Sequence, residues 1–98
     1  MFDVRETPDF TKWLAALNDQ RARLLIVRRI SRVAAGNFGD AKSVGGAVSE
    51  LRIDHGPGYR VYFTRRGKVV VILLCGGDKR TQSKGIRKAR EIAETLED

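Results

Sequence analysis

Residues 50–79, with the sequence ELRIDHGPGYRVYFTRRGKVVVILLCGGDK, decide the fold of this chain. Short runs of β-branched and aromatic residues alternate in this stretch with turns that contain glycine, which is the pattern of β-hairpins. We therefore predict three strands, over residues 50–54, 59–63 and 69–74, in two successive hairpins. The run 69–74 is apolar throughout, which predicts a central strand that is buried on both faces.

The first of these strands sorts its side chains by chemical character. Because successive side chains of a strand point to opposite faces, Leu51 and Ile53 fall on one face. Glu50, Arg52 and Asp54 fall on the other face, and we place Arg60 of the next strand beside Glu50 and Arg52. The apolar face is expected to meet the core, so the charged face is the candidate functional site.

The segments that flank the hairpins predict one further strand and three helices. Residues 2–6 alternate in period two, which is typical of a short strand. The helices follow from apolar residues at helical spacing and from capping residues: one begins at Thr7-Pro8, one covers about 20–35, and one follows Thr81 or Ser83.

Residues 36–46 form a glycine-rich connector between the second helix and the hairpins, and this connector lacks the spacing of a nucleotide-binding loop. The element order is therefore strand, helix, helix, three strands, helix. That order predicts an α+β fold with a small, mainly antiparallel sheet and helices packed on one face. We expect residues 1–98 to form a single domain.

The composition indicates what kind of partner the protein has. Nineteen Lys and Arg residues against twelve Asp and Glu residues give a net charge of +7, and the isoelectric point is near 10.2. Such a balance favours a polyanionic partner, either nucleic acid or an acidic protein, over an inert basic surface. Cys75 is the single cysteine, which fits a reducing compartment. We find no leader and no apolar run of roughly 18 residues, so we expect a cytoplasmic protein without a membrane partner.

Arginine is concentrated in the second predicted helix. Five arginines occur within twelve positions of this helix, at 21, 23, 28, 29 and 32. They could grip phosphate groups, they could be covered by an acidic partner, or they could simply be solvated. The pattern alone leaves these three interpretations open.

Few catalytic classes fit the remaining residues. One histidine, one cysteine and scattered carboxylates do not make a metal-ligand set, so we predict no metal and no cofactor. Cleavage of an RNA phosphodiester without a metal needs a proton acceptor for the ribose 2′-hydroxyl, cations for the phosphate, and a proton donor for the leaving oxygen. Arg52, Arg60 and Lys79 can supply the cations.

The proton carriers are less well defined by the sequence. Glu50 could act as the base, and so could His55, although a histidine in a Gly-Pro turn is more often solvated. Tyr59 offers a stacking ring or a weak acid. The competing structural interpretation is that Glu50 and Arg52 only pair with charges across the sheet.

Several motifs together strongly resemble the RelE/ParE superfamily of bacterial toxins, and more narrowly the HigB-type addiction module killer proteins related to phage Gp49. These motifs are Glu50-Leu51-Arg52, the GYRVYF segment at 58–63, and the GGDK segment at 76–79 followed by Gln82 and Ile86. The resemblance covers essentially the whole chain.

The resemblance implies a toxin of a type II toxin-antitoxin pair that binds the ribosome and cuts mRNA. It also implies a cognate antitoxin, usually with a helix-turn-helix domain, and a toxin-antitoxin hetero-oligomer that binds operator DNA. Matched by position, the resemblance implies catalytic roles for Arg60, for Arg52 and for Lys79 or Arg80. From the residue types we keep Glu50 or His55 as the base, and we expect RNA contacts at Arg80, Tyr59 and Lys84. For the antitoxin we expect contacts at Arg21, Arg28, Arg29 and Arg32, or on the charged sheet face.

The chain departs from ribonuclease members of that superfamily in two places. Those relatives carry a second basic residue where Glu50 falls, and a tyrosine or histidine where this chain has Gly85-Ile86. The ParE branch shares the fold, lacks the ribonuclease residues and inhibits DNA gyrase. Because the branch that this chain resembles is grouped with HigB, and because Arg52, Arg60 and Lys79 share one plausible face, we expect an mRNA endoribonuclease. A gyrase inhibitor is the alternative, and an inactive homologue that only binds antitoxin is a third possibility.

Overall fold

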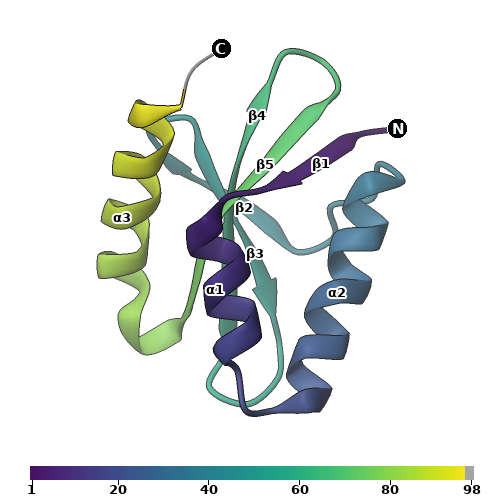
Figure 1. Cartoon of the computed structure of the whole chain (residues 1–98), viewed down its shortest axis with the longest axis vertical. Helices are drawn as coiled ribbons and strands as arrows, with labels where there is room; N and C mark the ends of the chain where they lie inside the picture. Colours follow the sequence, from purple (N-terminus) through teal and green to yellow (C-terminus); the bar gives the residue numbers. More distant parts are fainter. Residues whose placement is uncertain (97–98) are drawn as a thin grey trace.

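The computed structural model describes residues 1–96, so residues 97 and 98 of the predicted domain lie outside the described part. The elements in chain order are β1 (Asp3–Glu6), α1 (Pro8–Ala16), α2 (Gln20–Ala34), β2 (Ala41–Gly45), β3 (Val48–Ile53), β4 (Tyr59–Arg66), β5 (Val70–Asp78), the single-turn helix η1 (Lys79–Thr81) and α3 (Gln82–Thr95) (Figure 1). The predicted α+β class is confirmed.

The five strands form one mixed sheet in the order β1-β5-β4-β3-β2. β1 runs parallel to β5, and the other neighbouring strands are antiparallel. The apolar strand β5 lies in the interior, as predicted, with Leu73 in one core cluster and Leu74 and Cys75 in the other. The register of β4 and β5 shifts after Tyr62, and this bulge is why two consecutive residues of β5 face the same way.

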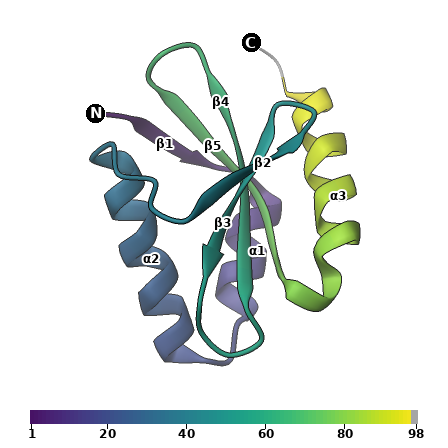
Figure 2. The same ribbon diagram turned by 180° about the vertical axis from the view of Figure 1, so that it is seen from behind.

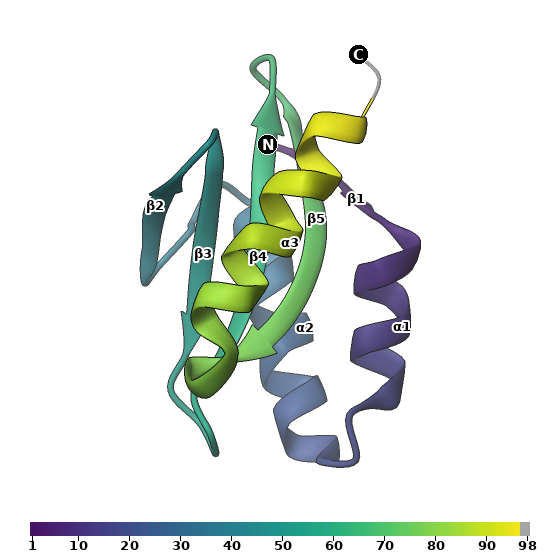
Figure 3. The ribbon, with the colours of Figure 1, turned by 90° about the vertical axis from the view of Figure 1, so that its left-hand side faces the viewer.

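Helices cover both faces of the sheet, which differs in detail from the predicted single helical face. α1 and α2 pack on one face, where Phe10 and Ile26 meet Leu51 of β3. α3 packs on the opposite face, where Ala89 meets Tyr62 of β4. From behind, α1 lies beyond the strands (Figure 2), and in the side view β2 and α1 lie at opposite sides of the molecule (Figure 3). The small side chains of α3 allow this close approach to the face that carries Glu50.

Strand β2 is the element that the sequence pattern missed. It was predicted as part of the connector 36–46, but it pairs antiparallel with β3, with Lys42 opposite Glu50. The side chains of β2 are exposed except for a partly buried Val44. An edge strand with so little burial has no alternating apolar pattern, so periodicity cannot reveal it.

The helix starts follow from local capping. The Thr7 hydroxyl accepts a hydrogen bond from the Phe10 amide, and Pro8 begins α1, as predicted. Asp19 caps α2 in the same way. At α3 the predicted cap is different, because the Thr81 hydroxyl bonds with Asp78 in a capping box around η1 and does not cap α3 itself.

Candidate functional site

The pairing of β3 with β4 sets two arginines against each other. Arg52 lies directly opposite Arg60 in the antiparallel register, and Glu50 lies opposite Tyr62. All four side chains therefore belong to the sheet face on which α3 packs, as alternation predicted for Glu50, Arg52 and Arg60. Two guanidinium groups on adjacent strands repel each other unless an anion lies between them.

Glu50 supplies that anion from inside the protein. Its side chain is 0% exposed. One carboxylate oxygen accepts a hydrogen bond from Arg52 Nε at 3.1 Å, and the other lies 3.7 Å from Arg60 Nε. The amide nitrogen of Gln82, the first residue of α3, donates to both oxygens at 3.0 and 3.1 Å. Every oxygen of this carboxylate is therefore occupied.

Arg60 is held almost as tightly as Glu50. Its side chain is 11% exposed, and Nη1 donates to the carbonyl oxygens of Gly58 at 3.1 Å and Tyr59 at 3.4 Å. Gly58 has a φ of +79°, and a Cβ there would lie 3.5 Å from Arg60 Nη1 and 3.4 Å from Lys79 Cβ. The turn thus brings the end of β5 close to the Arg60 guanidinium.

An open hollow of about 280 Å³, which we call the arginine hollow, lies beside this network. It brings together the three predicted cationic residues, Arg52, Arg60 and Lys79, with two carboxylates that were not predicted. Its lining consists of Asp40, Arg52, Ile53, Asp54, Gly58, Arg60 and Lys79. Such a set of cations at the end of two strands can hold a phosphate group.

The predicted site residues His55 and Tyr59 lie outside the arginine hollow. His55 Nε2 is 3.0 Å from Asp19 Oδ2, so the imidazole ties the β3–β4 turn to the start of α2. The Tyr59 ring packs edge-on against Trp13, with 6.3 Å between ring centroids, on the face that α1 covers. The pKa of Asp19 is lowered, mainly by the Ala22 amide and next by His55. The structure therefore gives both residues local packing partners.

Arg80 and Lys84, the other predicted RNA contacts, are exposed near the start of α3. Neither lines the arginine hollow. They follow directly on Lys79 along η1 and the first turn of α3, so they extend its positive charge along the same end of the molecule.

The arginines of α2 divide into structural and exposed residues. Arg29 donates to the carbonyl oxygen of Arg52 at 2.6 Å and to that of Phe38 at 3.0 Å, and its burial lowers its pKa. Arg21, Arg28 and Arg32 are exposed. A second hollow, of about 220 Å³, is lined by Leu25, Arg28, Arg29, Arg32, Ile53 and Asp54. The two hollows share Ile53 and Asp54 as a common wall.

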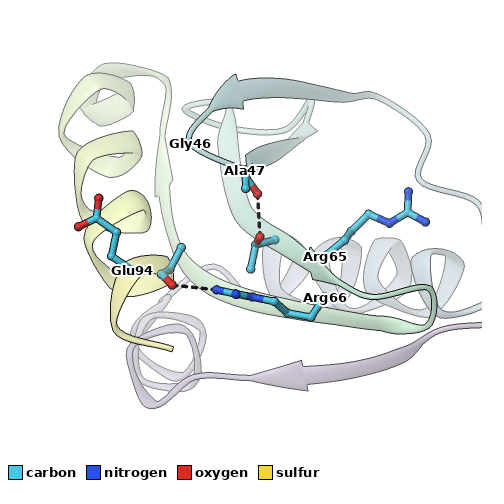
Figure 4. Close-up of a pocket in the computed structure, with 7 residues that line it drawn as sticks. Gly46, Ala47, Arg65, Arg66 and Glu94 are labelled. Carbon is cyan, nitrogen blue, oxygen red and sulfur yellow. Dashed lines mark hydrogen bonds between the residues drawn. The ribbon is translucent and has the colours of Figure 1, made fainter. Parts of the chain in front are cut away.

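A third hollow, of about 160 Å³, lies between the β2–β3 turn, β4 and the end of α3 (Figure 4). The Thr64 hydroxyl donates to the Ala47 carbonyl oxygen at 2.7 Å, and Arg66 Nη2 donates to the Ala93 carbonyl oxygen at 2.8 Å. The first bond fastens β4 to the β2–β3 turn and the second fastens β4 to α3, so we assign this hollow a structural role.

Sequence reasoning missed Gln82, Asp40 and Asp54 as site residues. Gln82 was noted only as part of a motif, because its contact with Glu50 depends on α3 folding back over β3. Alternation places Asp54 on the same face as Glu50 and Arg52, two positions after Arg52, but it assigns Asp54 no role in the site. No sequence signal marks Asp40, because it precedes β2, the strand that the apolar periodicity does not reveal.

Two general properties of the described residues bear on the chemistry of the protein. Within residues 1–96, no group of three or more His, Cys, Asp or Glu side chains is placed to hold a metal ion. None of the helices in this described part combines the length and apolar character that a membrane crossing requires.

Residues 12–97 match the model of a family described as phage derived protein Gp49-like (DUF891). The chain belongs to this family. The match runs from α1 to the end of the chain, so it includes every residue of the arginine hollow. An uncharacterized protein of Haemophilus influenzae (strain ATCC 51907 / DSM 11121 / KW20 / Rd) is 50% identical over 93 residues, which cover 95% of this chain and 94% of that protein. The predicted relation to phage Gp49 is therefore confirmed.

Proposed function

We propose that this Gp49-like protein is a toxin of a type II toxin-antitoxin pair that cleaves mRNA on the ribosome without a metal ion. The observation that carries the proposal is the pair of opposed arginines, Arg52 and Arg60, which share one hollow with Lys79. The likeness of the motifs to RelE and HigB toxins supports the same conclusion. Ribosomes are cytoplasmic, so the protein would act in the cytoplasm.

The cleavage we propose is an internal transesterification. The ribose 2′-hydroxyl loses its proton, the 2′ oxygen bonds to phosphorus, and the bond from phosphorus to the 5′ oxygen breaks. The products are a 2′,3′-cyclic phosphate and a 5′-hydroxyl end. Arg52 and Arg60 would stabilise the charge that grows on the phosphate, and the Lys79 ammonium would give a proton to the leaving oxygen.

We assign the proton acceptor to Asp54. A base must come within hydrogen-bond reach of the proton it removes. Asp54 is exposed, lines the arginine hollow, and makes no side-chain hydrogen bond or ion pair within residues 1–96. Asp40 also lines the hollow, but its backbone carbonyl oxygen accepts a hydrogen bond from Arg29, which ties this residue to α2. His55 faces Asp19, so it would have to break that contact to act.

The experiment that tests this function is induction of the protein alone in a bacterium, followed within minutes by primer extension across abundant transcripts. We expect new 5′ ends inside translated frames. Arg60→Ala should abolish them, and Arg87→Ala, which removes an exposed arginine of α3 that does not line the hollow, should not. Intact transcripts in arrested cells would contradict the proposal.

Two alternatives remain, and one observation favours each. The residues that line the arginine hollow include no aromatic side chain, which favours a ParE-like inhibitor of DNA gyrase over a ribonuclease. Broken DNA together with intact transcripts would identify that activity. The departure at Gly85-Ile86 favours an inactive homologue that only binds antitoxin, and normal growth during overexpression would identify it.

For the antitoxin we propose the outer face of α2 as its contact surface. Leu24 and Val27 are 48% and 47% exposed on this helix, and Arg21, Arg28 and Arg32 surround them with positive charge. An acidic segment with apolar residues one turn apart complements this surface. The antitoxin would also supply the helix-turn-helix domain through which the pair binds operator DNA. The rate at which the antitoxin associates with this protein should fall as the salt concentration rises. A rate that does not change with salt would argue against this surface.

A further inference from the structure

We propose that Glu50 is a positioning residue: it fixes Arg52 and Arg60, Gln82 in turn fixes Glu50, and Glu50 takes no proton from the substrate. The inference rests on the proposed ribonuclease function, and it replaces one of the two bases that the sequence suggested. It concerns the part of the site that no substrate atom can reach.

The Glu50 carboxylate is buried out of reach of a substrate. A base must approach the ribose hydroxyl to about 3 Å, heavy atom to heavy atom. The side chain of Glu50 has 0% of its surface exposed, and α3 begins directly over it. A substrate could reach this carboxylate only if α3 moved away from the sheet. Asp54, by contrast, lies open at the edge of the arginine hollow.

The Glu50 carboxylate has all its polar partners within the protein. A buried charge is costly unless it is paired and hydrogen-bonded. Arg52, Arg60 and Gln82 together occupy both oxygens of Glu50. These partners fix the carboxylate in the place where it offsets the repulsion between the two guanidinium groups.

Glu50 holds each arginine through its Nε atom, and this leaves other guanidinium nitrogens available to a ligand. Arg60 Nε is buried without a hydrogen bond, and its nearest anion is Glu50 at 3.7 Å. With Nη1 bonded to the turn carbonyls, Nη2 makes no hydrogen bond within residues 1–96. Arg52 uses only Nε to bind Glu50, so its terminal nitrogens are likewise unoccupied in the described part. These nitrogens are left to bind phosphate oxygens from the hollow.

Gln82 connects the start of α3 to Glu50. Within residues 1–96 its side-chain amide hydrogen-bonds only to Glu50, and its backbone carbonyl oxygen accepts a hydrogen bond from the Tyr62 hydroxyl at 3.4 Å. Gly85 lies one turn further on, where a Cβ would come within 2.7 Å of the Tyr62 ring. The first turn of α3 is thus seated on β4, and Gln82 transmits that fixed position to the arginines through Glu50.

The test measures cleavage of ribosome-bound mRNA by purified protein between about pH 5 and pH 9. We compare wild type with Gln82→Met, Glu50→Gln and Arg87→Ala. Gln82→Met removes the amide donor and touches no group in the hollow. We expect Gln82→Met and Glu50→Gln to lower cleavage by about 10- to 100-fold, since misplacement of a catalytic group costs that much. The acidic limb of the pH profile should persist in both variants, and Arg87→Ala should behave as wild type.

Two results would overturn the proposal. If Glu50→Gln removes the acidic limb while Gln82→Met cleaves normally, Glu50 is the base. If both variants cleave normally, Glu50 positions nothing. Should Glu50→Gln fail to fold, Gln82→Met decides alone, because it leaves every charge of the network in place.

A second readout is independent of cleavage. We expect the ¹⁵N-labelled Nε–H signals of Arg52 and Arg60 to shift and broaden in Gln82→Met, while the Arg87 signal stays unchanged. Unchanged Arg52 and Arg60 signals would refute the positioning role. If wild type cleaves no RNA, the proposed function fails, and these signals still show whether Gln82 holds the arginines.

Discussion

Gly76 of β5 lies directly against the Trp13 indole of α1, so closely that a Cβ at position 76 would come within 2.2 Å of the ring. Trp13 packs at the same time on Phe10 and Tyr59. The indole is therefore a core anchor between α1 and the sheet, and it takes Tyr59 with it.

We predict that Gly76→Ala destabilises the protein by about 1–3 kcal/mol, the usual cost of overpacking. Urea unfolding gives the value. The matched variant combines Trp13→Leu with Gly76→Ala. Because the smaller leucine relieves the clash, the double substitution should lower the free energy of unfolding by less than the sum of the two single substitutions. Additive costs would show that the two residues do not press on each other.

The second prediction separates two neighbouring arginines of α2. Arg29→Met should lower the free energy of unfolding by about 2–3 kcal/mol, because it leaves buried carbonyl oxygens without their charged donor. Arg28→Met should leave stability nearly unchanged and slow antitoxin association instead. Thermal unfolding and stopped-flow association measure the two effects. Equal stability of the two variants would contradict a structural role for Arg29.

The third prediction concerns the proton acceptor. Asp54→Asn should reduce mRNA cleavage by about 100-fold or more, the range expected for loss of a general base. Binding of an uncleavable 2′-deoxy substrate should persist, because the cations of the hollow remain. Asp40→Asn is the control and should retain most of the activity. The reverse ranking of the two variants would move the base to Asp40.

The fourth prediction follows from the buried thiol of Cys75. Burial is the main cause that raises its pKa from 9.0 to about 11, because it disfavours the thiolate. The fold therefore gains stability from the protonated thiol below about pH 9, and this gain is lost as pH rises through about 11. Measured by urea unfolding, the stability advantage of wild type over Cys75→Ala should shrink over that range. A constant difference would contradict the prediction.

Alternation along the strands predicted much of the site. It placed Glu50, Arg52 and Arg60 on one face, and the register confirms that placement. The same rule assigns Tyr59 to the face of Val61, away from Arg60, so its packing on Trp13 could have been foreseen. The contact of His55 with Asp19 could not, because turn residues follow no period.

Long-range contacts and weakly buried strands could not be predicted from the sequence, for physical reasons. β2 contributes exposed side chains, so no apolar period marks it. The clamp of Gln82 on Glu50 joins residues that are 32 positions apart, and only the docking of α3 brings them together. Which face α3 covers is likewise a matter of packing, settled by Ala89 and Ala93 against Tyr62 and Val48.

The parallel pairing of β1 with β5 has a consequence for the order of events during synthesis. Residues 3–6 are made first, yet their partners at 70–73 emerge from the ribosome only when most of the chain has been translated. Contacts of such sequence separation slow folding. Gln82, which completes the arginine network, emerges later still. The network of Glu50, Arg52 and Arg60 therefore stays incomplete until Gln82 has emerged and α3 has docked on the sheet.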